Sequence, residues 1–106
     1  MLASSLLFNN RQIVWERVAA LRLPAIYQFP EMAEEEGLLG YGPRLVHIYR
    51  DLISRQVIKV LRGASPAAIP VEQPTRVELV INLKAAKAIS HEIPASLVLR
   101  ADKVIE

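Results

Sequence analysis

Apolar side chains in the early part of the chain recur at steps of three and four residues, which is the spacing of one helical face. The repeat follows Asn9 and Asn10, either of which can cap the free amides at the start of a helix. It stops at Leu23-Pro24, because the residue before a proline is steered away from helical geometry. The repeating positions are Ile13, Val14, Val18 and Leu21. The sequence therefore predicts a first helix that begins at Asn9 or Asn10.

Three short stretches have the composition of β-strands, at residues 24–28, 38–41 and 76–82. The first is short, apolar and bounded by prolines, as expected of a buried parallel strand. The third alternates and is rich in β-branched side chains. A brief acidic helix over residues 31–36, with Pro30 at its start, is predicted between the first two strands.

The longest predicted helix covers residues 43–62, with Gly63 as its stop. Its apolar positions cover more than one stripe, which indicates a core on one side and a partner on another. They are Leu45, Val46, Ile48, Tyr49, Leu52, Ile53, Val57, Ile58, Val60 and Leu61. An extended segment follows over residues 64–74, and two further helices are predicted over residues 83–90 and from Pro94 onward. The apolar positions of the last helix are Leu97, Val98, Val104 and Ile105.

Helices that alternate with strands predict an α/β fold with parallel strand pairing. Three strands are fewer than the usual count of about four to six. Of the 106 residues, 52% are hydrophobic, and a chain of this size hides only about two-thirds of its surface. We therefore expect one domain over residues 1–106 whose sheet and apolar faces are completed by association, as a homodimer or higher homo-oligomer.

Charge and motif content exclude several classes of function. The 13 basic and 11 acidic side chains are interspersed and give a net charge of +2. They do not form the basic stripe that is typical of a nucleic-acid-binding protein. There is no cysteine, which removes thiolate metal sites and cysteine nucleophiles. The chain also lacks a phosphate-binding glycine loop and the motifs of metalloproteases and serine hydrolases. We predict no catalysis, no metal and no cofactor.

Two groups of titratable side chains were weighed against that prediction. His47 and Asp51 stand four residues apart on the long helix and could bind a metal together, but a helix-surface pair is the favoured interpretation. The acidic run is Glu31, Glu34, Glu35 and Glu36. It is interpreted as a solvated group that complements a helix dipole rather than as an acid–base site.

Four aromatic residues, Phe8, Tyr27, Phe29 and Tyr41, fall at or near the ends of predicted strands or at a helix start. Ligands of open α/β sheets bind outside the carboxyl ends of the strands. A tyrosine there offers an apolar face and a polar tip to a ligand. From spacing alone, however, the favoured interpretation is that these rings fill the core.

Most of the chain resembles the C-terminal part of the bacterial ABC-transporter substrate-binding proteins. The matching text is L-P-A-I-Y at residues 23–27, E-E-G-L-L-G-Y-G at 35–42, L-R-G at 61–63, I-P-V-E-Q-P at 69–74, E-L-V-I-N-L-K at 78–84 and A-D-K-V-I at 101–105. The resemblance implies a partial periplasmic-binding-protein-like fold of type I, taken from a longer protein whose two lobes close on a ligand. The residues at 24–28 and 76–82 would belong to the second lobe, and those at 38–41 and 43–62 to the first.

The resemblance also implies a function, which is non-catalytic binding of a small organic ligand, such as an amino acid or an aromatic or carboxylic acid. The implied ligand-binding residues are Phe8, Asn9, Tyr27, Tyr41 and Gly42. The chain departs from the family text at Gly40, where serine is common, and at Ser90-His91, where Gly-Leu is common. An alternative is an interaction module that has lost ligand binding, and an enzyme is the third possibility.

The resemblance further implies an ABC permease as partner and a periplasmic location. The apolar run over residues 1–8 lacks a basic start and ends early, so the chain as written carries no recognisable export signal and reads as cytoplasmic.

Overall fold

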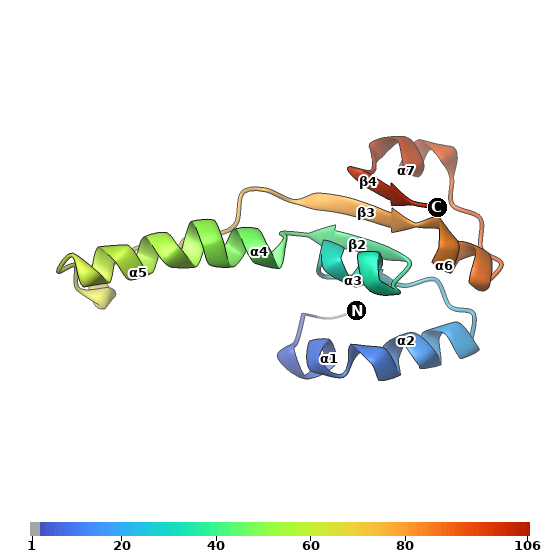
Figure 1. Cartoon of the computed structure of the whole chain (residues 1–106), viewed down its shortest axis with the longest axis horizontal. Coiled ribbons are helices and arrows are strands. Elements are labelled where there is room, and N and C mark those ends of the chain that lie inside the picture. The colour runs from blue at the N-terminus through green and yellow to red at the C-terminus, as the bar shows by residue number, and fades with distance from the viewer. Residues whose placement is uncertain (1–2) are drawn as a thin grey trace.

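The computed structural model describes residues 3–106 as a mixed α/β body from which one long arm projects (Figure 1). The run of residues 1–8 interpreted above begins outside the described residues, and its remainder leads into the first helix, α1 (Ser5–Asn9). The helices of the body are α2 (Arg11–Ala20), α3 (Pro30–Glu35), α6 (Leu83–Ala88) and α7 (Ala95–Arg100). The strands are β1 (Ile26–Tyr27), β2 (Leu39–Gly42), β3 (Glu78–Asn82) and β4 (Lys103–Ile105).

The four strands form one sheet in the order β1-β2-β3-β4. β1 pairs with β2 in parallel, and β3 pairs with β4 in parallel. The central pair, β2 and β3, is antiparallel, with Gly40 opposite Val80 and Tyr41 opposite Leu79. The predicted α/β class and the first three strands are confirmed, but the expectation of parallel pairing throughout is wrong for this central pair. The reason is that the helix between β2 and β3 does not pack across the sheet and instead leads the chain outward and back.

The fourth strand corrects the prediction that Val104 and Ile105 belong to the last helix. α7 ends at Arg100, and Ala101 already has an extended backbone. The next residues pair with β3, where Val104 lies opposite Ile81. The amide of Leu79 donates to the Asp102 carboxylate at 2.8 Å, which fixes the register of this edge strand.

The family resemblance assigned residues 24–28 and 38–41 to different lobes of the longer two-lobed proteins. In the structure these two segments are neighbours in one sheet, with Ile26 opposite Leu39 and Tyr27 opposite Gly40. The first predicted helix is also two helices, because the chain bends at Asn10 between α1 and α2. The helix over residues 83–90 is confirmed as α6, and the side-chain oxygen of Asn82 accepts from the amide of Ala85 to cap it.

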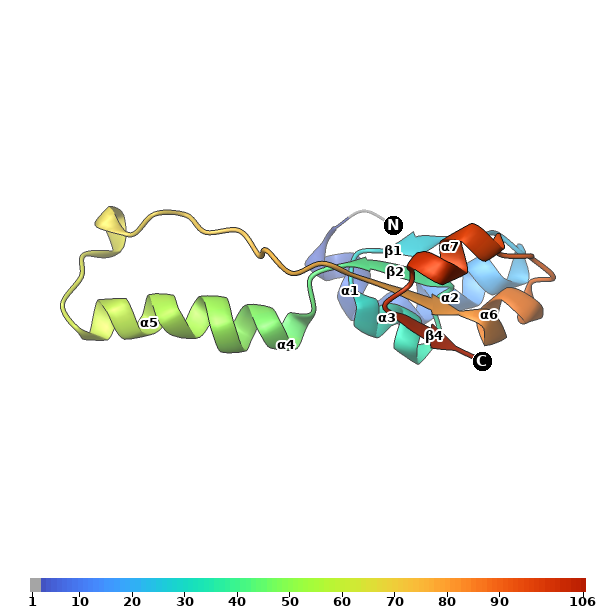
Figure 2. The same ribbon diagram turned by 90° about the horizontal axis from the view of Figure 1, so that it is seen from above.

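The long predicted helix is confirmed as a continuous rod of three segments: α4 (Leu45–His47), the π-helical η1 (Ile48–Ile53) and α5 (Ser54–Leu61). A short 3-10 turn, η2 (Pro66–Ala68), follows, and an extended segment returns to β3 (Figure 2). We call residues 45–77 the arm, and residues 3–44 with 78–106 the body. The arm makes the molecule elongated, at 55 × 29 × 16 Å with a radius of gyration of 16.8 Å, against about 13 Å for a compact domain of this length.

The buried apolar side chains of residues 3–106 all lie in the body, and many of them belong to two clusters. One is built on Trp15, Tyr27 and Met32, with Phe8 and Phe29 packed against it. The other joins the start of β2 to α6 and is built on Leu38, Ala86 and Ile89. No helix among residues 3–106 is long and apolar enough to cross a bilayer.

Candidate functional site

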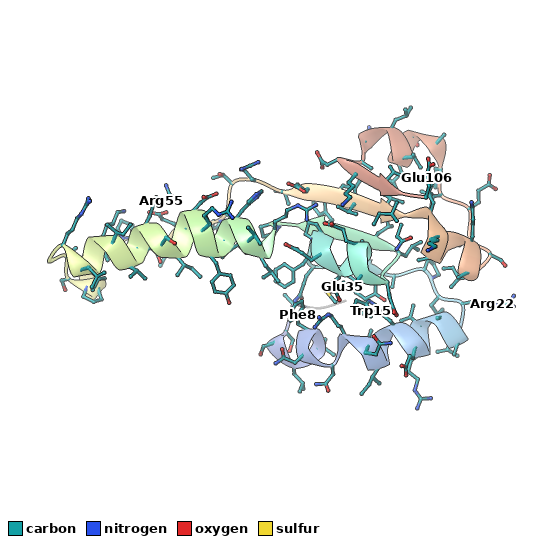
Figure 3. All side chains as sticks on the ribbon, viewed as in Figure 1. Phe8, Trp15, Arg22, Glu35, Arg55 and Glu106 are labelled. Atoms are coloured by element: carbon teal, nitrogen blue, oxygen red, sulfur yellow. The ribbon has the colours of Figure 1, made fainter. Side chains whose placement is uncertain are left out.

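The carboxyl ends of β1 and β2 meet at one edge of the sheet, because these two strands run in parallel. Residues of α1 reach the same edge, where the ring of Phe8 meets Phe29 edge to face at a centroid distance of 5.5 Å. Figure 3 shows Phe8 and Trp15 on the side of α1 and α2 that faces α3. Three of the predicted ligand-binding residues, Phe8, Tyr41 and Gly42, thus lie at or beside this carboxyl edge, which ligands of open α/β sheets favour.

Arg11, the first residue of α2, connects α1 and α2 to α3 beside Phe8. Its guanidinium lies 4.6 Å from the centre of the Phe8 ring and donates to the Phe8 carbonyl at 3.1 Å. It also pairs with Glu35 at 2.8 Å. Asn9, the last residue of α1, is exposed. This region therefore presents a half-buried aromatic ring and an exposed amide side chain, and Arg11, which the sequence analysis did not single out, holds the ring in place.

Two glycines of β2 allow the segment after β1 to lie directly on the strand. A Cβ at Gly42 would stand 2.1 Å from the carbonyl oxygen of Gln28, and one at Gly40 would stand 2.6 Å from that of Phe29. No side chain fits in those spaces. The atoms that approach Gly40 and Gly42 therefore belong to the chain itself.

Tyr27 and Tyr41 project from opposite faces of the sheet. Tyr27 shares its face with Gly40, its partner in the parallel register, and side chains on successive residues of β2 alternate between faces. Tyr27 is 2% exposed and packs against Trp15, whereas Tyr41 is 56% exposed. Burial raises the pKa of the Tyr27 hydroxyl. The structure therefore does not bring these two predicted residues into one site.

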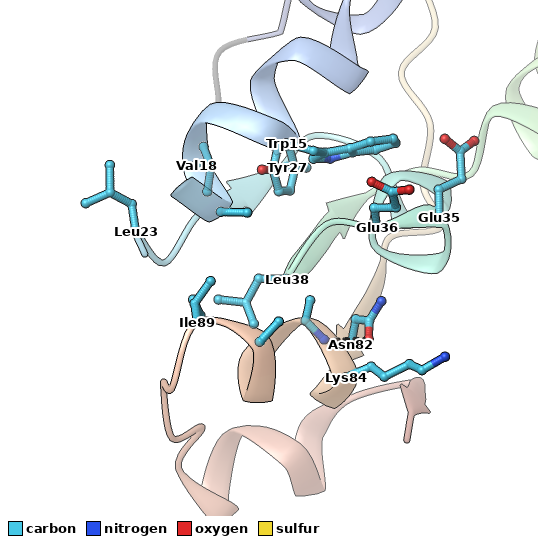
Figure 4. Close-up of a pocket in the computed structure, with 13 residues that line it drawn as sticks. Trp15, Val18, Leu23, Tyr27, Glu35, Glu36, Leu38, Asn82, Lys84 and Ile89 are labelled. Atoms are coloured by element: carbon cyan, nitrogen blue, oxygen red, sulfur yellow. Dashed lines mark hydrogen bonds between the residues drawn. The ribbon is translucent and has the colours of Figure 1, made fainter. Parts of the chain in front are cut away.

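A cavity of about 380 Å³ lies at the opposite edge, where β1 and β2 begin. Figure 4 shows Trp15, Val18 and Tyr27 on one side of it, with Leu38, Asn82 and Ile89 on the other. The indole Nε1 of Trp15 is buried without a hydrogen-bond partner in the structure. Trp15 is not among the candidate site residues of the sequence analysis, and the signal that could have pointed to it is a large aromatic ring with a single hydrogen-bond donor.

The acidic residues of α3 hold the base of the arm, so the expectation that they stay solvated is wrong for Glu31 and Glu34. Glu31 accepts from the amide of Leu45 at 2.9 Å and so caps the arm helix. Glu34 pairs with Arg44 and with Lys103, the latter at 2.9 Å. Burial alone would raise the pKa of Glu34, but hydrogen bonds from Lys103 and Arg44 outweigh it and lower the pKa.

Arg44 completes this group, since it also pairs with Glu78 at 2.5 Å. Burial would lower the pKa of Arg44, and the hydrogen bonds to Glu34 and Glu78 raise it instead. Glu34, Arg44, Glu78 and Lys103 are joined by ion pairs, so they connect α3, the base of the arm, β3 and β4. Within residues 3–106, no three His, Cys, Asp or Glu side chains gather in a way that could hold a metal ion.

Comparisons with known proteins agree with this architecture. The family model for ABC transporter substrate binding proteins matches residues 3–105, so the chain belongs to that family. The family consists of solute-binding components of ABC transporters and is typically periplasmic. No curated protein matches the chain.

Two of the solved structures that share the fold are similar over most of this chain. One is the ABC domain from Streptococcus pneumonia in complex with L-Trp, with a TM-score of 0.82, 25% identity and 98% of this chain covered. The other is a conserved domain protein from Vibrio cholerae, with a TM-score of 0.72, 22% identity and 80% of this chain covered. The present chain spans 35% of the first structure and 28% of the second. It corresponds to about a third of the substrate-binding-protein fold.

Proposed function

We propose that this chain binds a small organic ligand without transforming it, at the carboxyl edge of β1 and β2. The observation that carries the proposal is the placement of Tyr41, Asn9 and Phe8. The first two are exposed and the third is half-buried, at an edge built of parallel strands in a member of a solute-binding family. Binding without chemistry fits this edge, because its charged side chains are already paired.

The proposed ligand has an aromatic or apolar part and a polar group, as in an amino acid or an aromatic or carboxylic acid. Tyr41 and Phe8 supply ring surfaces from opposite faces of the sheet, since Phe8 packs on the cluster of Tyr27, and the side-chain amide of Asn9 supplies both a donor and an acceptor. The L-Trp complex of the Streptococcus structure supports a ligand of this class. Tyr27 contributes to this proposal as a buried support of the edge, since its ring packs on Trp15.

The experiment is a thermal-shift screen with amino acids, aromatic acids and small carboxylates. A ligand is expected to raise the melting temperature of the native chain and of Tyr41→Phe, and to raise that of Tyr41→Ala and Asn9→Ala far less. Tyr49→Ala removes a similarly exposed tyrosine from the arm (64% against 56% for Tyr41) and is expected to keep the full shift. Equal shifts in Tyr41→Ala and Tyr49→Ala would place the ligand elsewhere, with the cavity beside Trp15 as the next location to test.

We further propose that the chain works as a homo-oligomer. The arm exposes a row of large apolar side chains, and exposed apolar surface of this kind marks contact sites. The same observation favours the second candidate function, an interaction module without a ligand. If no ligand raises the melting temperature of a chain that is folded and self-associates, the result would favour that second function. A permease of an ABC transporter is the partner that family membership suggests for the first.

A further inference from the structure

The cavity beside Trp15 lies where β1 and β2 begin, away from the edge proposed above as a ligand site. Its volume of about 380 Å³ is within the range of about 300–1,000 Å³ that is usual for sites of small molecules. Its walls come from α2, β1, α3, the residue before β2 and α6, so the body forms it without the arm. Trp15, Val18, Leu38 and Ile89 are among the apolar side chains of the wall (Figure 4). The indole nitrogen of Trp15 is itself enclosed, so its ring offers a ligand only apolar surface.

Tyr27 brings a polar group without a partner to this apolar wall. Its side chain is 2% exposed, and its hydroxyl makes no hydrogen bond with the residues that the structure describes. Figure 4 shows the hydroxyl end of Tyr27 directed towards Val18 at the wall of the cavity. Asn82 also lines the cavity, but its side chain already bonds to Ala33 and Ala85. Because an enclosed hydroxyl without a partner costs free energy, the wall favours a ligand that offers Tyr27 a hydrogen bond.

One end of the cavity carries free charges of both signs. Figure 4 shows Glu36, which follows α3, and Lys84, the second residue of α6, on opposite sides of this end. Both side chains are exposed, and neither forms an ion pair within residues 3–106. Glu35 lines the cavity as well, but it is paired with Arg11 at 2.8 Å. One carboxylate and one ammonium group therefore remain for a ligand.

We propose that the cavity beside Trp15 is a second ligand site, and that it takes a small zwitterion whose side chain is apolar apart from one hydroxyl. The ammonium group of the ligand pairs with Glu36, its carboxylate pairs with Lys84, and its hydroxyl exchanges a hydrogen bond with Tyr27. The rest of the ligand lies against Trp15 and Ile89. An α-amino acid with a phenolic side chain has all of these groups.

This site is separate from the carboxyl edge of β1 and β2, and it does not depend on ligand binding there. Tyr41 and Asn9 do not line the cavity, and Ala88, which does, is an exposed residue of α6. Tyr41→Ala is therefore expected to keep binding in the cavity, whereas Ala88→Phe, which places a ring in it, is expected to abolish that binding.

The first test uses the fluorescence of Trp15, which is the only tryptophan of the chain and lines the cavity. L-tyrosine is expected to change its emission in a saturable way when only tryptophan is excited. Tyramine lacks the carboxylate and 3-(4-hydroxyphenyl)propionate lacks the ammonium group. Each is expected to bind about three- to fivefold more weakly, because the two ion pairs are exposed. L-phenylalanine lacks the hydroxyl and is expected to bind about tenfold more weakly, because Tyr27 is buried.

Equilibrium dialysis against L-tyrosine accompanies the titration. Absence of binding by dialysis would overturn the proposal, and so would binding that leaves the emission of Trp15 unchanged. Equal affinities for L-tyrosine, tyramine and the propionate would overturn the recognition of a zwitterion.

The second test assigns the three contacts with matched variants. Lys84→Gln is expected to remove the preference for L-tyrosine over tyramine, and Lys87→Gln, at an exposed lysine of the same helix outside the cavity, is expected to keep it. Glu36→Gln is expected to remove the preference for L-tyrosine over the propionate. Tyr27→Phe is expected to bind L-tyrosine and L-phenylalanine equally. A Lys84→Gln variant that discriminates as Lys87→Gln does, or a Tyr27→Phe variant that still prefers L-tyrosine, would overturn the proposal.

The third test separates this site from the carboxyl edge. Loss of the emission change in Ala88→Phe, with the change kept in Tyr41→Ala, supports the cavity. The reverse result would place L-tyrosine at the edge, which overturns this proposal and supports the function proposed above. A thermal-shift screen that fails at the edge leaves the emission change of the native chain as an independent result. Melting of Ala88→Phe near the native temperature shows that its loss of binding does not come from unfolding.

Discussion

The body and the arm contain similar side chains but differ in what surrounds them. In the body, Met32, Val80 and Ile81 are fully buried. In the arm, residues 45–77 include no buried residue, although its helix carries ten apolar positions. Burial, rather than composition, stabilises a domain, at about 25 cal/mol per Å² of apolar surface removed from water. We therefore expect the body to be more stable than the arm.

The most direct test of this comparison replaces one glycine of the body and one glycine of the arm by alanine and compares the two losses of stability. Gly42→Ala forces a Cβ to within 2.1 Å of the Gln28 carbonyl and is expected to cost about 3 kcal/mol. Gly63→Ala meets open space and costs only the strain of its positive φ, about 1–2 kcal/mol. Urea unfolding measures both. Equal costs would mean that the contact between residue 28 and β2 does not stabilise the body.

A second comparison removes apolar atoms from each region. Met32→Ala leaves a cavity under α3 and is expected to lower the free energy of unfolding by about 2–5 kcal/mol. Val57→Ala removes a half-exposed side chain of the arm, and in the monomer its effect is expected to stay within about 0.5 kcal/mol. Urea unfolding at a dilution that separates the copies gives both values. A cost for Val57→Ala comparable to that of Met32→Ala would show a hidden core in the arm.

The smallest expected effect concerns charge. The pKa of Glu34 is lowered in the folded chain, so its carboxylate stabilises the fold above its ordinary pKa of 4.5, and that contribution is lost as the pH falls through the folded value. Glu34→Gln is expected to cost up to about 1 kcal/mol at neutral pH and to flatten the acid side of the stability profile.

The matched change in the arm, Glu72→Gln, breaks the pairs to Arg55 and Lys59 and is expected to cost less, because Arg55 is mostly exposed. Unfolding followed from pH 7 to pH 3 measures both variants. A profile of Glu34→Gln that parallels the native one throughout would contradict the role of Glu34.

The sequence predicts the elements of this fold better than their arrangement. Pro24, Pro30, Gly63 and Pro94 mark element ends through backbone geometry, which is a local property, and the elements beside them are confirmed. β4 was missed because three residues are too few to show alternation, and its partner β3 lies more than twenty positions earlier. The antiparallel central pair was missed because the alternation rule assumes that a helix between two strands packs on the sheet.

The candidate site shows the same division. Phe8, Asn9, Tyr41 and Gly42 were predicted from resemblance, and the structure places them near one edge of the sheet. Whether they bind a ligand stays a prediction. The opposite orientation of Tyr27 follows from strand register, which single positions in a sequence do not reveal. The cavity beside Trp15 likewise depends on how α2 and α6 meet, a contact between segments far apart in the chain.

The most direct measurement is amide hydrogen exchange of the native chain at high and at low concentration. The account predicts that amides of β2 and β3 are protected equally at both, whereas amides over residues 46–60 are protected when concentrated and exchange rapidly on dilution. Protection of the arm that does not change with dilution would contradict the claim that a second copy covers it.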